Sequence, residues 1–564
     1  VSTFSYEPVQ ARRMNKRDIQ NLRRWHRKAA LRAQSAGFDL IYVYAAHALS
    51  ALHYFLSRRH NDRADEYGGS PDNRARLLRE IIEDTREAVG DTCAVPVRLS
   101  MDELLGEHGL HRAEAEDLIG SMAELPDLWD LTLAGWENDS TTSRFTEQGH
   151  QEPFVTGVKR LTTKPVVGVG RYTSPDAMVG AVRKGIVDLI GAARPSIADP
   201  FLPKKIEEGR EDDIRECIGC NICVSGDFTM SPIRCTQNPT MGEEWRRGWH
   251  PERIRPAGSD RKVLVVGAGP AGLECAHALG KRGYPVTLAE AGTELGGRVV
   301  RESRLPGLSA WIRVRDYRAQ QLQKLPDVSV YFDSRLSADQ ILEFEFSRVV
   351  IATGARWRRD GVGHHRLQPL GIHPDAEVFC PDDLMDGSRP SGERVLVWDD
   401  DHYYMGGVMA ELLAGEGYEV TYTTPASGVS VWTRATLEQR FIQKRLIERG
   451  VAIRPNLVLK NVDPGGVRLS CVYSGRDEAA AADAVLLVTA RLPDEALSLE
   501  LEARRAEWAD AGVESVTAIG DALAPATIAH AVYAGRRYAE ELDAPSMDED
   551  ALPFRRELAA LAVS

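Results

Sequence analysis

Short apolar segments alternate with longer amphipathic segments along the first part of the chain. The apolar runs predict β-strands at residues 38–45, 95–100, 128–134, 165–170 and 189–193. Residues 16–36 and 74–89 carry apolar side chains at helical spacing, which predicts amphipathic helices. Strands that alternate with helices indicate a parallel sheet, here the later part of a (β/α)₈ barrel. Too few residues precede the first strand for three further units, so we expect a barrel that lacks its N-terminal strands.

A different pattern follows a polar stretch, residues 238–260, which predicts a linker. Apolar strands are predicted at residues 262–266, 286–290, 349–351, 395–398 and 516–519. We therefore expect an α/β chain with a partial barrel at 1–237 that includes a cysteine cluster. A nucleotide-binding domain of Rossmann type at 261–390 and 496–564 follows, and a second nucleotide-like domain at 391–495 is inserted into it.

Composition narrows the class of protein. Hydrophobic residues make up 43% and charged residues 27% of the 564 residues, which is typical of globular proteins. The chain has 70 Lys and Arg against 83 Asp and Glu, and this net charge of −13 argues against nucleic acid as a partner. No apolar run reaches the roughly 20 residues of a membrane span, and the first residues do not read as a secretion signal. We expect a cytoplasmic protein with no membrane partner.

Four of the eight cysteines lie close together in the sequence. Two residues separate Cys217 from Cys220 and Cys220 from Cys223, and eleven residues separate Cys223 from Cys235. Three thiolates from a tight loop and a fourth that returns can hold a [4Fe–4S] cluster. A structural zinc site is the alternative, although zinc ligands usually come as two separated pairs. Buried cysteines without a metal are a further alternative.

A glycine-rich turn follows the strand at 262–266. Gly267, Gly269 and Gly272 form the GxGxxG pattern that allows a tight turn, a close approach to a pyrophosphate and helix packing on the sheet. Glu290 ends the next strand and can accept hydrogen bonds from an adenosine ribose. Further nucleotide-binding candidates follow two later strands: Thr353, Gly354, Gly520 and Asp521. Together they resemble the glutathione-reductase type of nucleotide fold; a ligand-free glycine turn is the alternative.

Polar residues gather where the predicted barrel strands end, and the chemistry of a barrel is found on that face. Tyr44 and His47 lie at the C-terminal end of the first strand and can exchange protons with a substrate, and Asp139 can orient His47; a structural histidine is the alternative. Arg98 lies near the end of the next strand, where a cation can stabilise negative charge. Candidates for a phosphate site end the last two strands: Gly170, Arg171, Ala193 and Arg194.

Several stretches resemble the old yellow enzyme family of FMN barrels. They are residues 61–70 (NDRADEYGGS), with Asn73 and Arg74, and residues 194–203 (RPSIADPFLP). Barrel, cysteine cluster and nucleotide domain in this order are similar to the branch that contains the trimethylamine, dimethylamine and histamine dehydrogenases and 2,4-dienoyl-CoA reductase. The histamine dehydrogenases are the most similar.

This resemblance implies cofactors, partners and roles. It implies FMN, a [4Fe–4S] cluster, ADP or FAD, a small amine substrate, an electron-transfer flavoprotein or similar one-electron acceptor, and a homodimer. The catalytic residues fall on Tyr44, His47 and Asp139, and an aromatic wall of the substrate pocket falls on Trp136. Asp227 falls on a second wall, which is aromatic in trimethylamine dehydrogenase and acidic in histamine dehydrogenase; a surface carboxylate in the cysteine loop is the alternative. No cysteine precedes Cys93, so covalent attachment of FMN is not indicated.

The strand at 395–398 leads into a turn that lacks the glycines of the first nucleotide motif. Asp399, Asp401 and Tyr404 stand where the three glycines would be. Acidic side chains there would repel a pyrophosphate, so we expect no NAD(P)H binding; alternatively the turn is simply solvated. We therefore predict an iron–sulfur flavoprotein amine dehydrogenase. An NADPH-dependent dienoyl-CoA reductase and a non-catalytic electron-transfer protein are the alternatives.

Overall fold

The computed structural model describes residues 12–256 and 260–543, which form two compact units. The first unit comprises the described residues up to Thr141 together with Thr146–Pro195. The second comprises Thr142–Phe145 and the residues from Ser196 onward.

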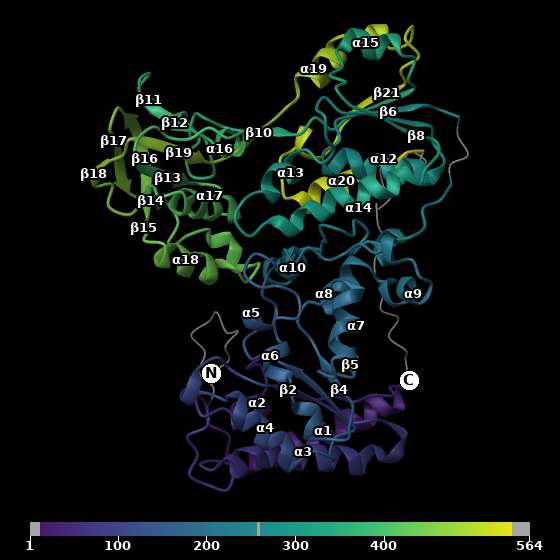
Figure 1. Cartoon of the computed structure of the whole chain (residues 1–564), viewed down its shortest axis with the longest axis vertical. Helices are drawn as coiled ribbons and strands as arrows, with labels where there is room; N and C mark the ends of the chain where they lie inside the picture. Colours follow the sequence, from purple (N-terminus) through teal and green to yellow (C-terminus); the bar gives the residue numbers. More distant parts are fainter. Residues whose placement is uncertain (1–11, 257–259, 544–564) are drawn as a thin grey trace, which may run out of the picture. The chain divides into compact units, whose positions relative to one another are not determined.

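The first unit is built on five parallel strands, each hydrogen-bonded to the next along the chain (Figure 1). They are β1 (Val43–Ala45), β2 (Pro96–Ser100), β3 (Leu128–Thr132), β4 (Val166–Gly168) and β5 (Leu189–Ile190). The sequential order is that of a barrel wall, in which every strand is followed by a crossover. Both faces of the central strands are largely covered: in β2 every residue except Arg98 is buried, and in β3 the four residues from Trp129 to Thr132 are buried.

Helices connect and cover these strands. The long ones are α1 (Lys16–Ser35) and α3 (Pro71–Val89), and each begins at a side-chain cap, Asn15 and Ser70 respectively. The others are α2 (Ala51–Leu56), α4 (Arg112–Ser121), α5 (Trp136–Asp139), α6 (Glu152–Val155) and α7 (Pro175–Arg183), with α8 (Ala193–Ala198) following β5.

The predicted elements occur at the predicted places, but the first strand is shorter than expected. The sequence predicts a strand over residues 38–45, whereas the structure has an isolated bridge from Leu40 to Ala94 and then β1. Phe38 and Leu40 are half exposed or more. Among the described residues β1 has β2 as its one partner strand, so its beginning lacks the second neighbour that would extend the ladder.

The second unit contains two five-stranded parallel sheets. The first has the order β21-β9-β6-β7-β8. Its strands are β6 (Val263–Val266), β7 (Val286–Ala289), β8 (Val328–Tyr331), β9 (Arg348–Ile351) and β21 (Ser515–Ala518). β21 pairs with β9, so this sheet is completed after the intervening domain, and Figure 1 shows the yellow β21 beside the teal strands. Its helices are α12 (Pro270–Arg282), α13 (Arg298–Ser303), α14 (Arg313–Gln323), α15 (Ala338–Glu343), α19 (Ala496–Ala503) and α20 (Ile528–Glu541).

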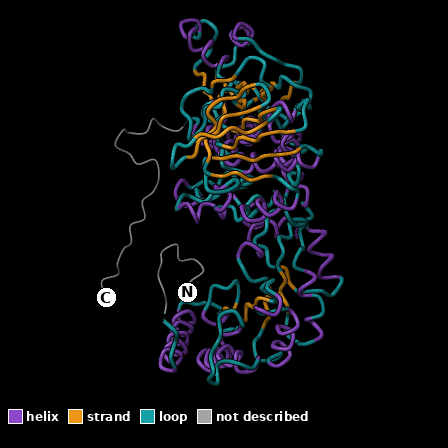
Figure 2. The backbone as a smooth tube through the Cα atoms, turned by 90° about the vertical axis from the view of Figure 1, so that its left-hand side faces the viewer, coloured by secondary structure: helices purple, strands orange, loops and turns teal. Residues whose placement is uncertain are grey.

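The second sheet has the order β12-β19-β13-β14-β15. Its strands are β12 (Glu377–Phe379), β13 (Arg394–Asp399), β14 (Glu419–Thr424), β15 (Ala452–Pro455) and β19 (Ala484–Val488). Helices α16 (Pro381–Met385), α17 (Tyr404–Gly415) and α18 (Gln439–Glu448) accompany it. A smaller sheet consists of β11 (Gly371–Ile372), β16 (Leu457–Asp463), β17 (Gly466–Cys471) and β18 (Asp477–Ala481), and β10 (Ala355–Trp357) pairs with β20 (Arg491–Pro493). Figure 2 shows strands of this unit side by side with helices around them.

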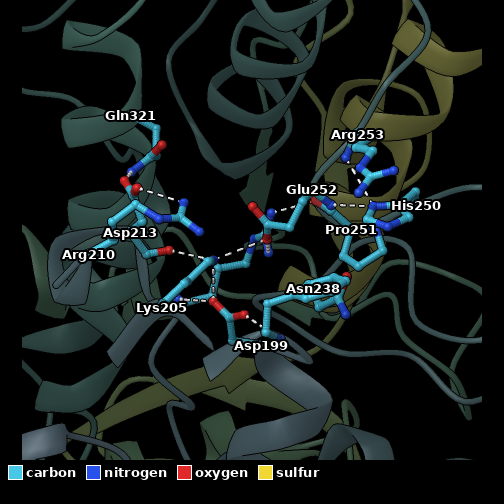
Figure 3. Close-up of polar contacts among 12 residues, drawn as sticks. Asp199, Lys205, Arg210, Asp213, Asn238, His250, Pro251, Glu252, Arg253 and Gln321 are labelled. Carbon is cyan, nitrogen blue, oxygen red and sulfur yellow. Dashed lines mark hydrogen bonds and ion pairs between the residues drawn. The ribbon is translucent and has the colours of Figure 1, made fainter. Parts of the chain in front are cut away.

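The segment after the barrel strands belongs to the second unit, which differs from the predicted boundary at residue 237. It contains α9 (Leu202–Glu207), α10 (Ile222–Thr229) and α11 (Glu244–Arg247). The fully buried Lys205 Nζ donates to Asp199 at 2.6 Å, to Glu252 at 3.1 Å and to the Asp213 carbonyl at 2.7 Å (Figure 3). Because all three ammonium protons have acceptors, this network ties the predicted linker to the preceding segment. Several residues of that predicted linker are buried in the second unit, including Thr240 and Glu243, whereas an exposed linker was expected.

None of the helices in the described part of the chain combines the length and hydropathy of a membrane span.

Candidate functional site

Tyr44 and His47 are brought together by a sharp turn at the end of β1. His47 and the next residue, Ala48, have φ of 58° and 54°, an uncommon conformation for residues other than glycine. The His47 amide donates to Ser100 Oγ at 2.9 Å, which fixes this turn to the end of β2. The Tyr44 hydroxyl is hydrogen-bonded to His47 Nδ1. Strained backbone of this kind is often retained where it aims a side chain.

Asp139 reaches the same place from α5. Its carboxylate lies 3.5 Å from His47 Nε2 and accepts from Thr132 Oγ1 at 2.7 Å and Gln151 Nε2 at 3.0 Å. Burial alone would raise the pKa of Asp139, but His47, Thr132 and Gln151 outweigh it and hold that pKa well below its usual range. Burial raises the pKa of Tyr44. The predicted triad therefore exists as one hydrogen-bonded chain with an anion at one end and a neutral phenol at the other.

Arg98 lies next to this chain and forms an ion pair. Tyr44 on β1, Arg98 on β2 and Asp130 on β3 are aligned across the sheet, and Arg98 Nη1 lies 2.9 Å from Asp130 Oδ2. Within the described residues, the buried atoms Arg98 Nε and Asp130 Oδ1 have no hydrogen-bond partner. Buried polar atoms without partners mark a place that a polar ligand can fill, so these residues fit a flavin ring.

The predicted phosphate-site residues lie at the ends of two neighbouring strands. Gly170 and Arg171 follow β4, and Ala193 and Arg194 begin α8 after β5, which pairs with β4. Arg171 is buried and has a φ of 56°. Arg194 Nη1 donates to the Ser140 and Thr141 carbonyls at 3.0 and 3.1 Å. Two anchored guanidinium groups at adjacent strand ends fit a phosphate.

The two predicted substrate-pocket residues belong to different units. Trp136 is half-buried and begins α5, the helix that ends at Asp139. Asp227 lies on α10 in the second unit, and its side chain is exposed there. Their roles as pocket walls stay predictions.

The four cysteines of the predicted cluster lie in the second unit around the start of α10. The Gly219 amide donates to Cys217 Sγ at 3.3 Å, and Cys220 Sγ lies 3.2 Å from Thr236 Oγ1. Burial raises the pKa of Cys220 to about 12 and of Cys235 to about 11, and the negative charge of Cys217 adds to both. Buried thiols whose charges act on each other need a cation to become thiolates.

The donor set itself bears on the kind of metal. All four candidates are thiols, and three of them follow one another at two-residue intervals. A run of this kind fits a [4Fe–4S] cluster, whereas structural zinc sites usually use two separated pairs.

The first glycine-rich turn opens onto a cavity of about 520 Å³. Gly267 and Gly269 line it, and a Cβ added to Gly269 would meet no protein atom within 4 Å. A Cβ on Gly272 would lie 1.9 Å from the Gly267 carbonyl oxygen, so this glycine is required by helix packing. One glycine leaves room for a ligand and the other closes the turn, which fits a nucleotide pyrophosphate.

The remaining predicted nucleotide-binding residues also divide into those that line the cavity and one that is required by packing. Glu290, Thr353, Gly354 and Asp521 line the cavity. Glu290 accepts hydrogen bonds from the Ala268 and Gly292 amides, both at 2.8 Å, so it also holds the glycine turn. Gly520 is a packing position, because a Cβ there would lie 2.6 Å from that of Ala271.

The second nucleotide-like turn is filled by its own side chains. Asp399 and Asp400 are fully buried, which contradicts the alternative of a solvated acidic turn. Asp399 accepts from the Asp401 and His402 amides at 3.1 and 3.0 Å and from the Tyr422 hydroxyl. The Asp400 carboxylate accepts from the His365 amide at 3.0 Å. The Asp399 carboxylate thus accepts from amides of its own turn, whereas the Asp400 carboxylate accepts from an amide in a distant loop.

Comparison with known proteins decides the family. Residues 2–213 match the NADH:flavin oxidoreductase / NADH oxidase family, 261–379 the pyridine nucleotide-disulphide oxidoreductases, and 379–481 the OYE-like second alpha/beta domain. Dimethylamine dehydrogenase from Hyphomicrobium sp. (strain x) is 41% identical over 96% of this chain and 77% of its own length. The chain belongs to the amine dehydrogenase branch of this flavin oxidoreductase family.

Solved structures agree with this membership of the amine dehydrogenase branch. Histamine dehydrogenase from Rhizobium sp. 4-9 is 56% identical with a TM-score of 0.97, covering 99% of this chain and 81% of that one. The 6-hydroxypseudooxynicotine amine oxidase from Pseudomonas geniculata N1 is 50% identical with a TM-score of 0.93, covering 96% and 81%. The predicted α/β fold, FMN-barrel family and flavin-dependent oxidoreductase class are confirmed.

Sequence reasoning missed the residues that hold the predicted ones in place. They are Ser100, Thr132 and Gln151 around His47 and Asp139, Asp130 beside Arg98, and Arg298 and Arg491 in the nucleotide cavity. Asp130 carried a signal, since a charged residue within an apolar strand needs a partner. Gln151 lies in a loop and carried none.

Proposed function

We propose that this chain oxidises a small amine that carries N–H groups, with a histamine-like primary amine as the leading candidate. The product is an aldehyde, and the electrons leave one at a time to an external acceptor. The observation that carries this proposal is the hydrogen-bonded chain Tyr44–His47–Asp139 at the end of the barrel strands.

The proton inventory of that chain suits amine oxidation. An ammonium ion has no lone pair with which to form an iminium, so the substrate must lose a proton before its α-carbon can release a hydride. The Asp139 anion favours a proton on His47 Nε2, which leaves Nδ1 free to accept from Tyr44. The phenol is thereby oriented toward the strand ends, where it can exchange a proton with the substrate. Water then hydrolyses the iminium to aldehyde and ammonia.

The cofactor residues support the rest of the route. Arg98, Arg171 and Arg194 would hold FMN, and Cys217, Cys220, Cys223 and Cys235 would hold the cluster. FMN held there would supply the chemistry of hydride acceptance, and a [4Fe–4S] cluster held by the four cysteines would supply transfer of one electron at a time. The acceptor we propose is an electron-transfer flavoprotein or another one-electron protein.

Asp227 directs the choice of substrate. A carboxylate prefers a cation with N–H groups, because it accepts charge-assisted hydrogen bonds from them. An aromatic wall suits a methylated ammonium instead, whose charge is spread and which has few donors. One solved relative is a histamine dehydrogenase and one curated relative a dimethylamine dehydrogenase, so the two chemistries are the ones to separate.

The substrate experiment uses a panel of histamine, putrescine, dimethylamine and trimethylamine with the parent protein and the Asp227→Trp variant. We expect the parent to prefer histamine and the variant to shift toward the methylated amines. Asp212→Asn, an exposed carboxylate change elsewhere in the same unit, is the control. A parent that prefers trimethylamine, or a variant with unchanged preference, contradicts the role of Asp227.

The cofactor experiment separates the metal alternatives. Anaerobically prepared protein should contain about four irons and four sulfides per chain for one cubane cluster. Cys220→Ala should still allow flavin bleaching by amine but stop rapid transfer to an acceptor. Stoichiometric zinc without iron would refute the cluster.

The reductase alternative has its own test. Asp399 and Asp400 occupy the second turn, so neither NADH nor NADPH should bleach the flavin, whereas amine with an artificial one-electron acceptor should turn over. Rapid anaerobic bleaching by NADPH would favour an enoyl reductase. Sedimentation of the holoenzyme tests the proposed homodimer.

A further inference from the structure

A buried ion pair lies beside the proton chain, and no role has yet been given to its acidic member. Asp130 is 3% exposed and extends from the middle of β3. It forms an ion pair with Arg98 on the adjacent strand, where Arg98 Nη1 lies 2.9 Å from Asp130 Oδ2. A hydrogen bond from the Tyr42 hydroxyl lowers the pKa of the Asp130 carboxyl group.

Asp130 therefore offsets part of the positive charge that Arg98 would otherwise exert on a neighbouring ligand. Burial raises the pKa of Asp130 above its usual value, although Arg98, Tyr42 and His47 act in the opposite direction. A guanidinium at hydrogen-bond distance favours the carboxylate form, so the pair carries no net charge. Because the surroundings are apolar strands, each charge acts over a longer range here than in water.

Arg98 and Asp130 each also have a buried polar atom without a hydrogen-bond partner in the described part of the chain. Arg98 Nε and Asp130 Oδ1 are buried and have no hydrogen-bond partner among the residues that the structure describes. If the ion pair were purely structural, we would expect Arg98 Nε and Asp130 Oδ1 to have hydrogen-bond partners within the protein, or apolar residues to stand in place of the pair. Arg98 Nε can donate a hydrogen bond and Asp130 Oδ1 can accept one, and the pair has no net charge. Such a pair suits a ligand whose charge changes during the reaction.

We propose that Asp130 sets the reduction potential of the bound flavin by cancelling the charge of Arg98. This rests on the proposed function, in which the flavin ring lies against Arg98. An unopposed guanidinium would stabilise the negative charge of the reduced ring and retain its electrons. With Asp130 present that stabilisation is smaller, so the two electrons taken from the amine pass more readily to the cluster, one after the other. Asp130 is a positioning and tuning residue rather than a group that exchanges substrate protons.

The experiment measures the flavin midpoint potential of the holoenzyme by anaerobic spectroelectrochemical titration. Asp130→Asn should raise it, with at least a tenfold change in the reduction equilibrium, which is about 30 mV for a two-electron couple. Asp130→Glu keeps the charge and should stay nearer the parent. Asp188→Asn is the matched control, because Asp188 precedes β5 at the other end of the strands and pairs with Lys159.

A double-variant cycle keeps the test decisive if Asp130→Asn does not retain FMN. Arg98→Gln alone should lower the potential, and Arg98→Gln with Asp130→Asn should return it toward the parent, since both charges are then gone. Equal potentials in Asp130→Asn and the parent overturn the proposal. So do equal potentials in Arg98→Gln and the double variant, or an equal shift in Asp188→Asn.

The outcome is separable from the fate of the proposed function. A parent protein that holds no FMN, or whose flavin no amine reduces, refutes the function itself. A parent that is bleached by amine while Asp130→Asn shows the parent's potential refutes the role of Asp130 alone.

Discussion

The two five-stranded sheets of the second unit share the order of four strands, β9-β6-β7-β8 and β19-β13-β14-β15, but differ in the turn after the strand of each set that comes first along the chain. In the first sheet, the turn after β6 leads into α12 through three glycines and borders an open cavity of about 520 Å³. In the second sheet, the turn after β13 leads into α17 through three aspartates and two tyrosines, and Asp399, Asp400 and Tyr404 are buried.

The difference shows what a phosphate-binding turn needs besides its backbone. At a helix start, free amides attract an anion. In the first turn, Gly269 lines the cavity, and an added Cβ there would meet no protein atom within 4 Å, so a ligand has room beside the backbone. In the second, the Asp399 carboxylate accepts from the Asp401 and His402 amides, so a side chain takes the place that an anionic ligand could occupy. The second sheet keeps the fold of a nucleotide domain without its binding site.

The two turns are also physically connected. The Tyr404 hydroxyl donates to Glu302, and Arg298 Nη2 donates to Tyr404 at 3.4 Å. Arg298 and Glu302 line the nucleotide cavity, where Arg298 and Arg491 both pair with Asp521, at 2.8 and 2.9 Å. The tyrosine that replaces the third glycine thus supports the wall of the neighbouring site.

The largest expected effect comes from the first turn. Gly272→Ala places a Cβ 1.9 Å from the Gly267 carbonyl oxygen, where backbone must move. We expect a loss of stability at or above the roughly 3 kcal/mol upper end of ordinary overpacking, together with loss of bound nucleotide. Calorimetry and the nucleotide released on denaturation measure the two effects.

Gly269→Ala is the matched control for that substitution. Its Cβ meets no protein atom within 4 Å, and its φ of −70° is allowed for alanine. The melting temperature of the nucleotide-free protein should not change, while nucleotide content should fall. If both variants lose stability equally, the division between a packing glycine and a ligand glycine is wrong.

The second expected effect tests whether Asp399 substitutes for a ligand. Asp399→Ala leaves two backbone amides and the Tyr422 hydroxyl without their acceptor in a buried turn. At about 1 kcal/mol or more for each buried donor left unsatisfied, we expect a loss of about 3 kcal/mol. Asp399→Asn, which keeps one oxygen acceptor, should lose less. Added sulfate or phosphate that restores stability to the alanine variant alone would show directly that the carboxylate occupies an anion site.

Features of the two turns that depend on local spacing could be predicted from the sequence, whereas features that depend on contacts between distant residues could not. Gly267, Gly269 and Gly272 have a fixed spacing dictated by local geometry, so the open turn was predictable from the sequence. The Tyr44, His47 and Asp139 set was predictable because barrel strands end on one face. The burial of Asp399 and Asp400 was not, because the partners that satisfy them, Tyr422 and the His365 amide, are distant in the sequence. For the same reason Gln151 and Asp130 were missed.

A third prediction concerns pH. Burial, with the nearby Asp399, raises the pKa of Asp401 from 3.8 to about 6, while Arg491 and His364 oppose the rise. The folded protein therefore holds this proton more tightly than the unfolded chain. Its contribution to stability is complete below about pH 3.8 and is lost as the pH rises through about 6.

The measurement compares parent and Asp401→Asn across that window. Because asparagine does not ionise, the variant should be more stable than the parent at pH 7, by at most about 3 kcal/mol at 1.36 kcal/mol per pKa unit. The difference should shrink as the pH falls toward 4. A constant difference between pH 4 and 7 would mean that Asp401 does not titrate in this range.

The smallest expected effect tests the connection between the two turns. Tyr404→Phe removes the hydroxyl that Glu302 accepts from and that Arg298 donates to, but keeps the ring that packs on Trp311 at 4.7 Å. A hydrogen bond to a charged group contributes about 1.5 to 3 kcal/mol, and Glu302 keeps Arg298 as a partner, so we expect a loss near the lower value. Because Arg298 lines the cavity, the affinity for ADP, measured by titration calorimetry, should change severalfold in this variant. Tyr418→Phe, which removes a hydroxyl bonded to the Pro390 carbonyl in the same domain, should leave ADP affinity unchanged. Equal effects of the two variants on ADP binding would show that the filled turn does not act on the open one.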